Sequence, residues 1–283
     1  MHILITVIIS LALAFHGLRK KSLAKSGALG AFLVGIITLS NDQLAFTVVL
    51  LVFYFTGSRL TKYKAERKKK LGEAYQEGGQ RTAMQVACNA LTGTIICIIH
   101  QYYYGGQLKC LLDDHGSRLL FWMYIGHYST CNGDTRIIDV LEPQNYGSEK
   151  LLFCLYQHLM QVPPGTNGGV SPLGLLASVL GGFIIGASAV ISIYFADGCN
   201  RLYIELIPVA SIAGLIGSII DSILGATVQI SLYSEKSRMI SNSKTEETKL
   251  VSGYDLLDNN QVNFVSSLTT ALLIGFVADY IIG

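Results

Sequence analysis

The stretch that decides the fold is residues 204–230, IELIPVASIAGLIGSIIDSILGATVQI, in which only Glu205 and Asp221 are charged. A helix that crosses a membrane needs about 20 consecutive, mostly apolar residues. Residues 204–230 are long and apolar enough to meet this requirement. They therefore predict a membrane span that carries an acidic residue within its length.

Other apolar runs along the chain predict spans of their own. They cover residues 3–18, 27–40, 43–58, 83–104, 118–132, 168–196 and 261–282. The second, third and fifth of these runs are short, so each predicts either a complete span or a tilted or re-entrant half-span. The composition agrees, since 14% of the residues are charged against about 25% in a typical soluble domain. We therefore predict an all-α fold: a polytopic transmembrane helical bundle of about seven to eight spans, forming a single domain over residues 1–283.

The distribution of basic residues predicts the orientation of this bundle. Lys and Arg cluster in two short stretches, residues 19–25 and 59–70, and cytosolic loops of membrane proteins carry an excess of these residues. Two predicted spans separate the stretches, so one topology puts both of them in the cytosol. The predicted cytosolic loops are then residues 59–82, 133–167 and 231–260.

The same topology puts two cysteines on the opposite side of the membrane. The N-terminus and residues 105–117 and 197–203 face the lumen or the exterior in this arrangement. Cys110 and Cys199 lie in these two loops. They either form a disulfide in an oxidising compartment or stay unpaired.

The sequence lacks the short motifs of several common sites. No CxxC or HExxH spacing occurs, so a structural zinc site is not indicated. Neither a GxxxxGK[ST] phosphate loop nor a strand-linked GxGxxG is present, so any nucleotide would be bound without those folds. The net charge of +2 says little about partners. We expect contact with membrane lipid and none with nucleic acid.

Asp221 is the first candidate functional residue. Gly217, Asp221, Gly225 and Gln229 recur every four residues and share one helix face. An ionisable residue inside a span is by default a functional hypothesis. The alternative is that Asp221 lies near the cytosolic helix end and is merely solvated. A second stripe at every fourth residue, formed by Gly174, Ser178, Gly182 and Gly186, predicts close helix packing rather than catalysis.

The last predicted span begins with polar residues. Asp258 or Asn259 can cap its N-terminus. Helical spacing then forms one polar face from Asn259, Asn263, Ser266, Ser267 and Thr270. Such a face on a membrane helix must look toward protein or a wet cavity. It serves either a site or hydrogen bonding between helices.

Two loops have the composition of a phosphate and cation site. Residues 162–174, VPPGTNGGVSPLG, precede a span, and amides ahead of a helix N-terminus suit an anion. In residues 131–139, CNGDTRIID, paired Asp134 and Asp139 can hold Mg²⁺, which prefers oxygen ligands. Both loops can also be ordinary solvated loops. The topology nevertheless puts both of them, Asp221 and the start of the last span toward one membrane face, as a phosphate–Mg²⁺ site requires.

Five motifs in the chain resemble those of a known family. In order they are KAERKKKLGEAYQEGGQRTAMQVACN at residues 64–89, GDT at 133–135, VPPGTNGGVSPLG at 162–174, GSIIDSILGATVQ at 217–229 and LDNNQVNFVSS at 257–267. Together they resemble the family of transmembrane protein 19 and the plant phytyl-phosphate kinases over nearly the whole chain. The resemblance is greatest to the animal transmembrane protein 19 branch.

One motif departs from the family's pattern. Family members usually read GDTWASE, then any residue and Gly, whereas this chain reads GDTRIIDVL at residues 133–141. Asp134 and Thr135 are kept, Arg136 replaces the tryptophan and Asp139 replaces the glutamate. An aspartate can still bind a cation but reaches one methylene less far.

The resemblance implies an integral-membrane phosphotransferase that acts on an isoprenoid alcohol phosphate, with Mg²⁺ and a nucleoside triphosphate as co-substrate. Three carboxylates would be catalytic and hold Mg²⁺, namely Asp134, Asp139 and Asp221. Four cations would neutralise phosphates, namely Arg59, Lys62, Lys64 and the catalytic Arg81. Backbone amides would come from the loop of Gly165, Thr166, Asn167, Gly168 and Gly169, and oxygens would be positioned by Asn167, Asn259 and Asn263.

Two other functions remain open at this stage. Gly-interrupted spans with an intramembrane Asp also describe a lipid or small-anion transporter. A non-catalytic membrane scaffold is the third reading, and it predicts no loss of cellular function when Asp221 is replaced. No Arg- and Ser-rich transit segment precedes the first apolar run. We therefore expect a multi-pass protein of the endoplasmic reticulum or another endomembrane.

Overall fold

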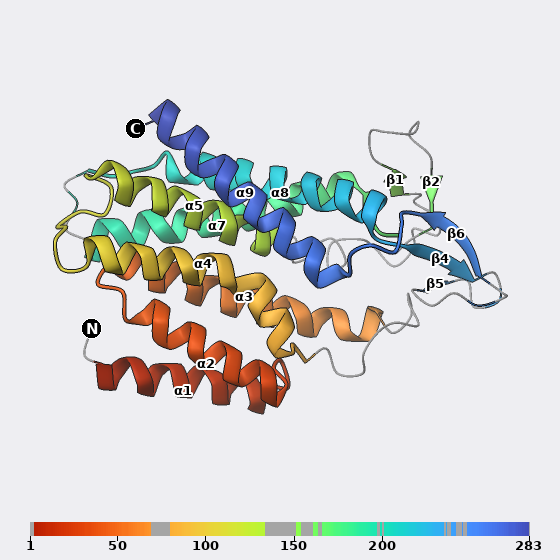
Figure 1. Ribbon diagram of the computed structural model, residues 1–283, viewed down its shortest axis with the longest axis horizontal. Helices are drawn as coiled ribbons and strands as arrows, with labels where there is room; N and C mark the ends of the chain where they lie inside the picture. The colour runs from red at the N-terminus through yellow and green to blue at the C-terminus, as the bar shows by residue number, and fades with distance from the viewer. Residues whose placement is uncertain are drawn as a thin grey trace.

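Long helices lying roughly along one axis make up most of the chain, as the computed structural model shows (Figure 1). The structure describes residues 3–68, 80–133, 151–153, 161–163, 166–196, 199, 201–234, 236, 239–241, 245 and 248–282. The helices found there are α1 (Ile3–Arg19), α2 (Lys25–Leu39), α3 (Leu44–Lys68), α4 (Ala83–Tyr104), α5 (His115–Gly133), α7 (Pro172–Ala196), α8 (Leu206–Val228) and α9 (Asn259–Ile282). They coincide with the predicted spans to within a few residues at most ends.

Successive helices run in opposite directions, so the connections gather at two ends of the bundle (Figure 1). One end, here called the disulfide end, carries both termini, residues 105–114 and residues 201–205. The opposite end, here called the sheet end, carries the end of α3, the starts of α4, α7 and α9, and two small sheets. The connections predicted to be cytosolic therefore share the sheet end, and those predicted to be non-cytosolic share the disulfide end.

The helices have the length and composition of a membrane bundle. By length and composition, α4, α7, α8 and α9 can each cross a membrane, while α1, α2 and the Leu44–Ser58 part of α3 are shorter apolar helices. The predicted class, a helical membrane protein, is confirmed. The number of full spans stays a prediction.

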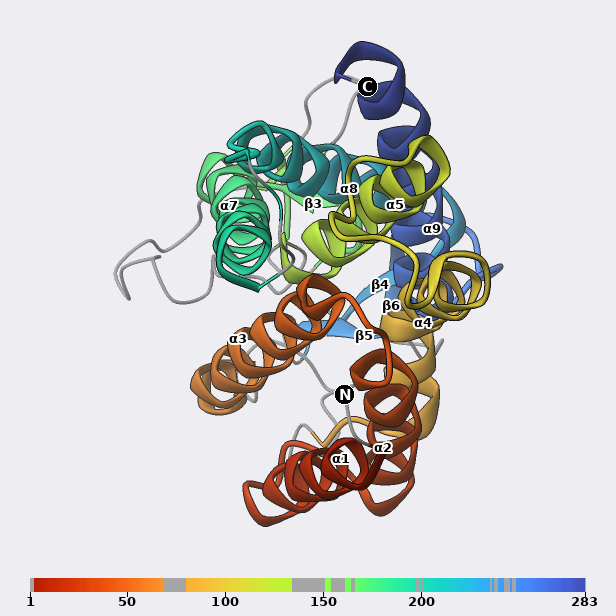
Figure 2. The same ribbon diagram turned by 90° about the vertical axis from the view of Figure 1, so that its left-hand side faces the viewer.

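Helix α5 is the centre of the bundle. It packs against α3, α4, α7, α8 and α9, an arrangement that Figure 2 shows in end view. Trp122, Tyr124 and Tyr128 are at most 1% exposed, and the Tyr124 hydroxyl donates to the Phe46 carbonyl of α3 at 2.7 Å. Because α5 contacts protein on most sides, it can carry more polar residues than a helix that faces lipid. This explains why its apolar run looked short in the sequence.

The stripe of small residues on α7 packs against α8, as predicted. A Cβ added at Gly182 would overlap the Ala210 carbonyl, and one at Gly186 would overlap the Leu206 carbonyl. In the opposite direction, Gly214 of α8 lies against the Ser178 carbonyl. Small residues on both helices therefore bring the two backbones close together.

Two regions predicted as loops also form short strands. The first sheet contains β1 (Leu151–Phe153), β2 (Gln161–Val162) and β3 (Gly169–Val170) in the order β2-β1-β3. The second contains β4 (Ser231–Ser234), β5 (Met239–Ser241) and β6 (Thr248–Ser252) in the order β5-β4-β6. All pairs are antiparallel. Each strand has only two to five residues. Such strands are too short for an alternation of polar and apolar residues to be recognised in the sequence.

The first part of the predicted cytosolic loop 59–82 is helical, because α3 continues to Lys68. Residues 58–71 contain neither Gly nor Pro and are rich in Lys and Arg, which favour helix. The apolar part of α3 therefore ends at Ser58, and the helix continues as a basic extension to Lys68.

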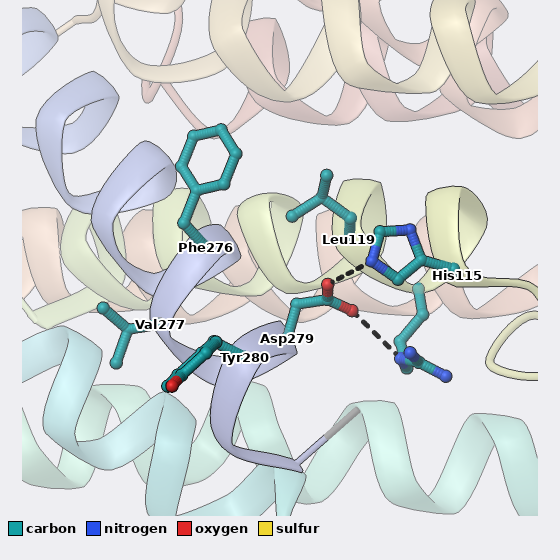
Figure 3. Close-up of a pocket in the computed structure, with 7 residues that line it drawn as sticks. His115, Leu119, Phe276, Val277, Asp279 and Tyr280 are labelled. Atoms are coloured by element: carbon teal, nitrogen blue, oxygen red, sulfur yellow. Dashed lines mark hydrogen bonds and ion pairs between the residues drawn. The ribbon is translucent and has the colours of Figure 1, made fainter.

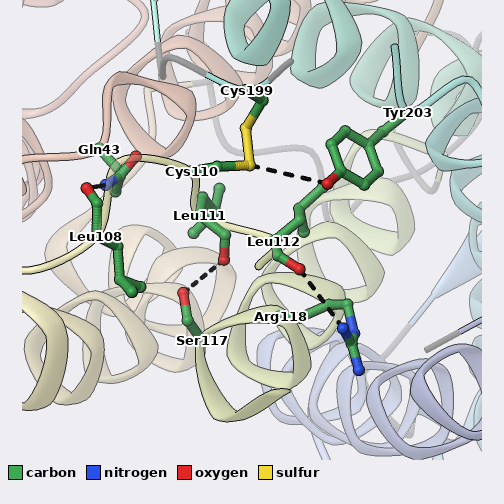
Figure 4. The surroundings of a disulfide bond; sticks show 9 residues. All are labelled: Gln43, Leu108, Cys110, Leu111, Leu112, Ser117, Arg118, Cys199 and Tyr203. Carbon is green, nitrogen blue, oxygen red and sulfur yellow. Dashed lines mark hydrogen bonds between the residues drawn. A yellow bond between two sulfur atoms is a disulfide. The ribbon is translucent and has the colours of Figure 1, made fainter. Parts of the chain in front are cut away.

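The disulfide end is closely tied together (Figure 4). Cys110 and Cys199 form a disulfide across 89 residues of sequence, so of the two alternatives the paired one is found. Beside it, Leu111 is fully buried, and its carbonyl accepts a hydrogen bond from Ser117 at 2.7 Å. Ser117 also bonds His100 of α4 at 2.9 Å. These contacts join the α4–α5 and α7–α8 connections.

Candidate functional site

Asp221 of α8 is bound by polar groups of α9. The Ser266 hydroxyl donates to Asp221 Oδ2 at 3.2 Å. The Asn263 amide, oriented with its nitrogen toward its acceptors, donates to the same oxygen at 3.2 Å and to the Asn259 carbonyl at 3.0 Å. Asp221 is only partly buried, so part of its surface stays accessible. The carboxylate therefore takes part in an interhelical cluster and is not merely solvated.

The polar face of α9 divides into two parts. Asn263 and Ser266 reach Asp221, whereas Ser267 and Thr270 are fully buried and donate within α9, to the Phe264 carbonyl at 3.2 Å and the Ser266 carbonyl at 2.8 Å. The bonds from Asn263 and Ser266 to Asp221 show the predicted hydrogen bonding between helices, and a role of this face in a site stays a prediction. The half nearer the sheet end belongs to the Asp221 cluster, and the other half is packing.

The connection from α8 to α9 explains why these side chains meet. Tyr254 N donates to the Thr227 carbonyl at 3.0 Å, and Leu256 N donates to the Val228 carbonyl at 3.1 Å. These bonds satisfy the last carbonyls of α8, which otherwise lack partners. Gly253 lies there with φ 74°, a conformation that glycine adopts without penalty. The chain then enters α9 beside α8.

A capping box fixes the start of α9. Asp258 Oδ1 accepts from Gln261 N at 2.8 Å, and Gln261 Oε1 accepts from Asp258 N at 2.8 Å. The reciprocal bonds are those of an N-terminal box, so Asp258 is the cap of the two candidates. This fixes the register that places Asn263 and Ser266 toward Asp221.

The loop of Thr166 to Gly169 packs on α8 about one turn beyond Asp221. Gly168 has φ 79°, and a Cβ there would overlap Ala226 and the Ser222 carbonyl. The Asn167 side chain donates to the Ile230 carbonyl at 2.9 Å. The loop predicted to bind phosphate is therefore held directly beside the Asp221 cluster.

Several backbone amides of this loop already have partners. Thr166 N donates to the Pro163 carbonyl at 3.2 Å, and Gly169 N to the Thr166 carbonyl at 3.1 Å. Asn167 N donates to Ser231 Oγ at 2.9 Å. These bonds hold the loop in shape, and its binding of a phosphate through amides stays a prediction.

The end of α5 lies where three other helices meet. Asn132 accepts from the Thr56 hydroxyl of α3 at 2.6 Å and donates to the Gly181 carbonyl of α7 at 2.9 Å. Two residues earlier, Thr130 fills the space left by Gly217 of α8, where a Cβ would overlap the Thr130 side chain. The first residue of the GDT motif, Gly133, ends the helix at this junction.

Arg81 lies on the other flank of α5. Its backbone forms a parallel bridge with Leu23, and its guanidinium approaches Gly57 of α3, where a Cβ would lie 2.9 Å from Nη2. Burial lowers the pKa of Arg81, and the nearby Cys131 and Tyr54 side chains oppose this shift. Arg81 thus adjoins the end of α5 from the α3 side, whereas Gly217, one helical turn before Asp221, adjoins it from the α8 side.

Some of the predicted site residues cannot be placed. Asp134, Asp139 and Gly165 lie outside the described residues. Arg59, Lys62 and Lys64 lie in the basic extension of α3, where the structure describes the backbone alone. The structure brings together Asp221, Asn263, Asn259 and the loop of Thr166, Asn167, Gly168 and Gly169, with Arg81 across α5.

The sequence analysis missed several residues that build this region. Thr56 and Asn132 join α3 to α5, Gly57 accommodates Arg81, and Ser231 holds the Asn167 amide. Thr56, Asn132 and Gly57 could have been noticed in the sequence, because each is a polar or small residue in an apolar run just before a motif. Ser231 carried no such signal, because it becomes adjacent only through β4.

The groups gathered here are of types that can bind phosphate. One partly exposed carboxylate, hydroxyl and amide groups and a guanidinium lie near the sheet end. Within the described ranges no group of three or more His, Cys, Asp or Glu side chains could hold a metal ion. A complete cation site would therefore need carboxylates in addition to Asp221.

Comparison with known proteins gives the family. The family model described as integral membrane protein DUF92 matches residues 8–271. Protein PGR of Arabidopsis thaliana is 36% identical over 291 residues, covering 99% of this chain and 97% of that protein. Protein VTE6, chloroplastic, of the same plant is 25% identical, covering 73% of this chain and 56% of that protein.

A relative is also found outside plants. The uncharacterized membrane protein sll0875 of Synechocystis is 28% identical, covering 74% of this chain and 73% of that protein. No solved structure matches the chain. On the family match and the similarity to Protein PGR, the chain belongs to the DUF92 family of integral membrane proteins.

Proposed function

We propose that this protein is an integral-membrane phosphotransferase that acts on an isoprenoid alcohol phosphate, depends on Mg²⁺ and uses a nucleoside triphosphate. The observation that carries the proposal is the cluster of Asp221, Asn263 and Ser266 with the Thr166–Gly169 loop packed beside it. An acidic group and phosphate-type loop at one end of a membrane bundle suit a substrate with a lipid chain and a phosphate head.

The proposed reaction needs no strong base. An anionic oxygen of the acceptor phosphate attacks the terminal phosphorus of the nucleoside triphosphate. A new phosphorus–oxygen bond forms, the bond to the leaving nucleoside diphosphate breaks, and an isoprenoid diphosphate results. Catalysis of this kind rests on positioning and charge neutralisation. Arg81 neutralises phosphate charge, and Asn263 and Ser266 hold the Asp221 carboxylate in place.

The donor groups fit the proposed Mg²⁺ in part. Asp221 offers carboxylate oxygen, the ligand type that Mg²⁺ prefers. When bound, Mg²⁺ neutralises phosphate oxygens. Asp134 and Asp139 follow the end of α5, which lies against α7 and α8, and we propose them as the other carboxylates.

The packing of the disulfide end favours an enzyme over a transporter. Alternating access requires both ends of a bundle to open in turn. Here the Cys110–Cys199 disulfide and the buried Ser117 and His100 side chains join the connections at one end. Access from the sheet end alone suits a phosphotransferase.

The family branch and the membrane in which the protein resides are part of the same proposal. We place the chain with the animal transmembrane protein 19 branch and in an endomembrane such as the endoplasmic reticulum. The disulfide supports an oxidising compartment on one side of that membrane. One relative, Protein VTE6, is described as chloroplastic, so organelle separation is a direct check on this placement.

The experiment uses purified full-length protein in nanodiscs. It receives Mg²⁺, each labelled nucleoside triphosphate in turn, and phytyl, geranylgeranyl or farnesyl monophosphate. Labelled isoprenoid diphosphate is the expected product, and the productive pair identifies donor and acceptor. No product with any pair, from protein shown to be folded, contradicts the proposal. Passage of the monophosphate across vesicles without nucleotide would instead establish the transporter.

A further inference from the structure

A groove lies far from this site, at the disulfide end between α5 and α9 (Figure 3). Its volume is about 760 Å³. His115, Arg118 and Asp279 form its polar wall, and Phe276 and Val277 contribute to its apolar part. The groove therefore combines charge and apolar surface in one place, as an amphipathic ligand does.

The polar wall consists of two basic residues around one acid. Asp279 Oδ2 lies 2.8 Å from His115 Nε2, and Asp279 Oδ1 lies 3.1 Å from Arg118 Nε. The Asp279 side chain is 11% exposed and that of His115 is 73% exposed. Both carboxylate oxygens are thus occupied. Arg118 binds Asp279 through Nε, so the amino groups of its guanidinium remain for other acceptors, apart from one 3.5 Å contact with the Leu112 carbonyl.

Exposed aromatic side chains show where this groove lies in the membrane. Tyrosine is enriched at the level of lipid head groups. Exposed aromatic residues end three helices at this end of the bundle, namely Tyr102 and Tyr103 of α4, Tyr194 and Phe195 of α7, and Tyr280 of α9. Asp279 precedes Tyr280 directly, so the ion cluster lies at head-group depth, where lipid phosphates are found.

The apolar part of the groove continues toward the middle of the bilayer. Phe276 and Val277 lie about one turn of α9 before Tyr280 and are exposed on the outside of the bundle. Leu119 of α5 lines the same groove. An acyl chain lying against these side chains would have its phosphate beside Arg118 and His115.

We propose that this groove binds one glycerophospholipid of the non-cytosolic leaflet, by its phosphate at Arg118 and His115 and by an acyl chain along Phe276 and Val277. A guanidinium matches the geometry of phosphate and binds it through charge-assisted hydrogen bonds. Asp279 is a positioning residue that holds both basic side chains at the groove. The site is independent of the proposed phosphotransfer site.

The test is native mass spectrometry of the delipidated full-length protein. Wild type is incubated with dioleoyl phosphatidylglycerol, with dioleoylglycerol, which has the same chains without phosphate, or with inorganic phosphate. The test variant combines Arg118→Gln with Asp279→Asn, which removes the charges together and leaves no unpaired acid. The matched control combines Arg201→Gln with Glu205→Gln, a second Arg–acid pair at the same end that does not line the groove.

Wild type and the control variant are expected to retain one phosphatidylglycerol after gentle activation, and the test variant is expected to lose it. Retention by the test variant overturns the proposal. Equal retention of dioleoylglycerol also overturns it, since apolar contact alone would then suffice, as does displacement of the lipid by inorganic phosphate. If the double variant does not fold, His115→Ala replaces it, because that side chain is largely exposed, and lipid loss is again expected.

Discussion

Ser266 of α9 donates a hydrogen bond to Asp221 of α8, with 3.2 Å between Ser266 Oγ and Asp221 Oδ2. The bond joins two helices that are separated in sequence by the second sheet. Ser266 Oγ also lies 3.1 Å from the Asn263 carbonyl of its own helix, but it reaches Asp221, whereas the hydroxyl of its neighbour Ser267 donates to the Phe264 carbonyl. Adjacent serines therefore have different roles, which makes them a natural pair for mutation.

Replacing Ser266 by Ala is expected to reduce turnover. The change removes a donor to a carboxylate, and hydrogen bonds to charged groups contribute about 1.5–3 kcal/mol. If that bond positions Asp221 for catalysis, kcat falls roughly ten- to hundredfold. Steady-state kinetics with the productive substrate pair measure the effect. Ser267→Ala is the control and is expected to leave kcat near that of wild type; equal losses in both variants would mean that Ser266 acts by packing alone.

Replacing Gly168 by Ala is expected to displace the Thr166–Gly169 loop from α8. The residue has φ 79° and its Cβ would overlap Ala226, and a strained backbone residue costs about 1–3 kcal/mol. Activity should fall together with the thermal midpoint in detergent. Gly106→Ala has a similar φ of 68° with no atom within 4 Å, so it reports backbone strain alone. A Gly106 variant as inactive as the Gly168 variant would argue against a specific role for the loop.

Replacing Gly57 by Ala is expected to disturb Arg81. The new Cβ would lie 2.9 Å from Arg81 Nη2, so the guanidinium must move. Since Arg81 is proposed to neutralise phosphate, KM for the phosphorylated substrate should rise more than kcat falls. Gly30→Ala is the control, because its Cβ would be 3.4 Å from Val86, close to ordinary contact. Unchanged KM in the Gly57 variant would remove Arg81 from the substrate site.

Removing the disulfide is expected to destabilise the protein without abolishing its chemistry. A native disulfide typically contributes about 2–4 kcal/mol, so Cys110→Ser with Cys199→Ser should lower the thermal midpoint. Cys88→Ser removes a free cysteine and is expected to leave it unchanged. In intact cells, maleimide should label Cys110 and Cys199 only after reduction. Labelling without reduction would place this end in a reducing compartment and reverse the proposed orientation.

The positions of the helices could be predicted because each helix coincides with a run of apolar residues in the sequence. Residues 83–104 were predicted and found as α4 to the residue. The central helix α5 was the least obvious, since Trp122, Tyr124 and His127 are buried by other helices and need not resemble a lipid-facing sequence. The strands were not predictable, because each short segment gains its partner only after the helices have brought it there.

Several candidate residues could be chosen from the sequence, but their contacts could not. Asp221, Asn263 and Gly168 were chosen from composition and spacing, and the structure brings them to one region. The separation of Ser266 from Ser267 depends on helix rotation, which the sequence does not determine finely enough. Thr56 and Asn132 meet across α3 and α5, and no local pattern indicates that contact.

The most direct test of the central claim compares two carboxylates on one helix. Asp221→Asn and Glu205→Gln each replace an acid of the α8 region by its amide, Asp221 toward the sheet end and Glu205 at the disulfide end. Transfer of labelled phosphate from nucleoside triphosphate to isoprenoid monophosphate is measured for both variants and for wild type. The proposal predicts that Asp221→Asn abolishes transfer while Glu205→Gln retains it. Transfer by a folded Asp221→Asn variant at the wild-type rate would contradict the proposed site.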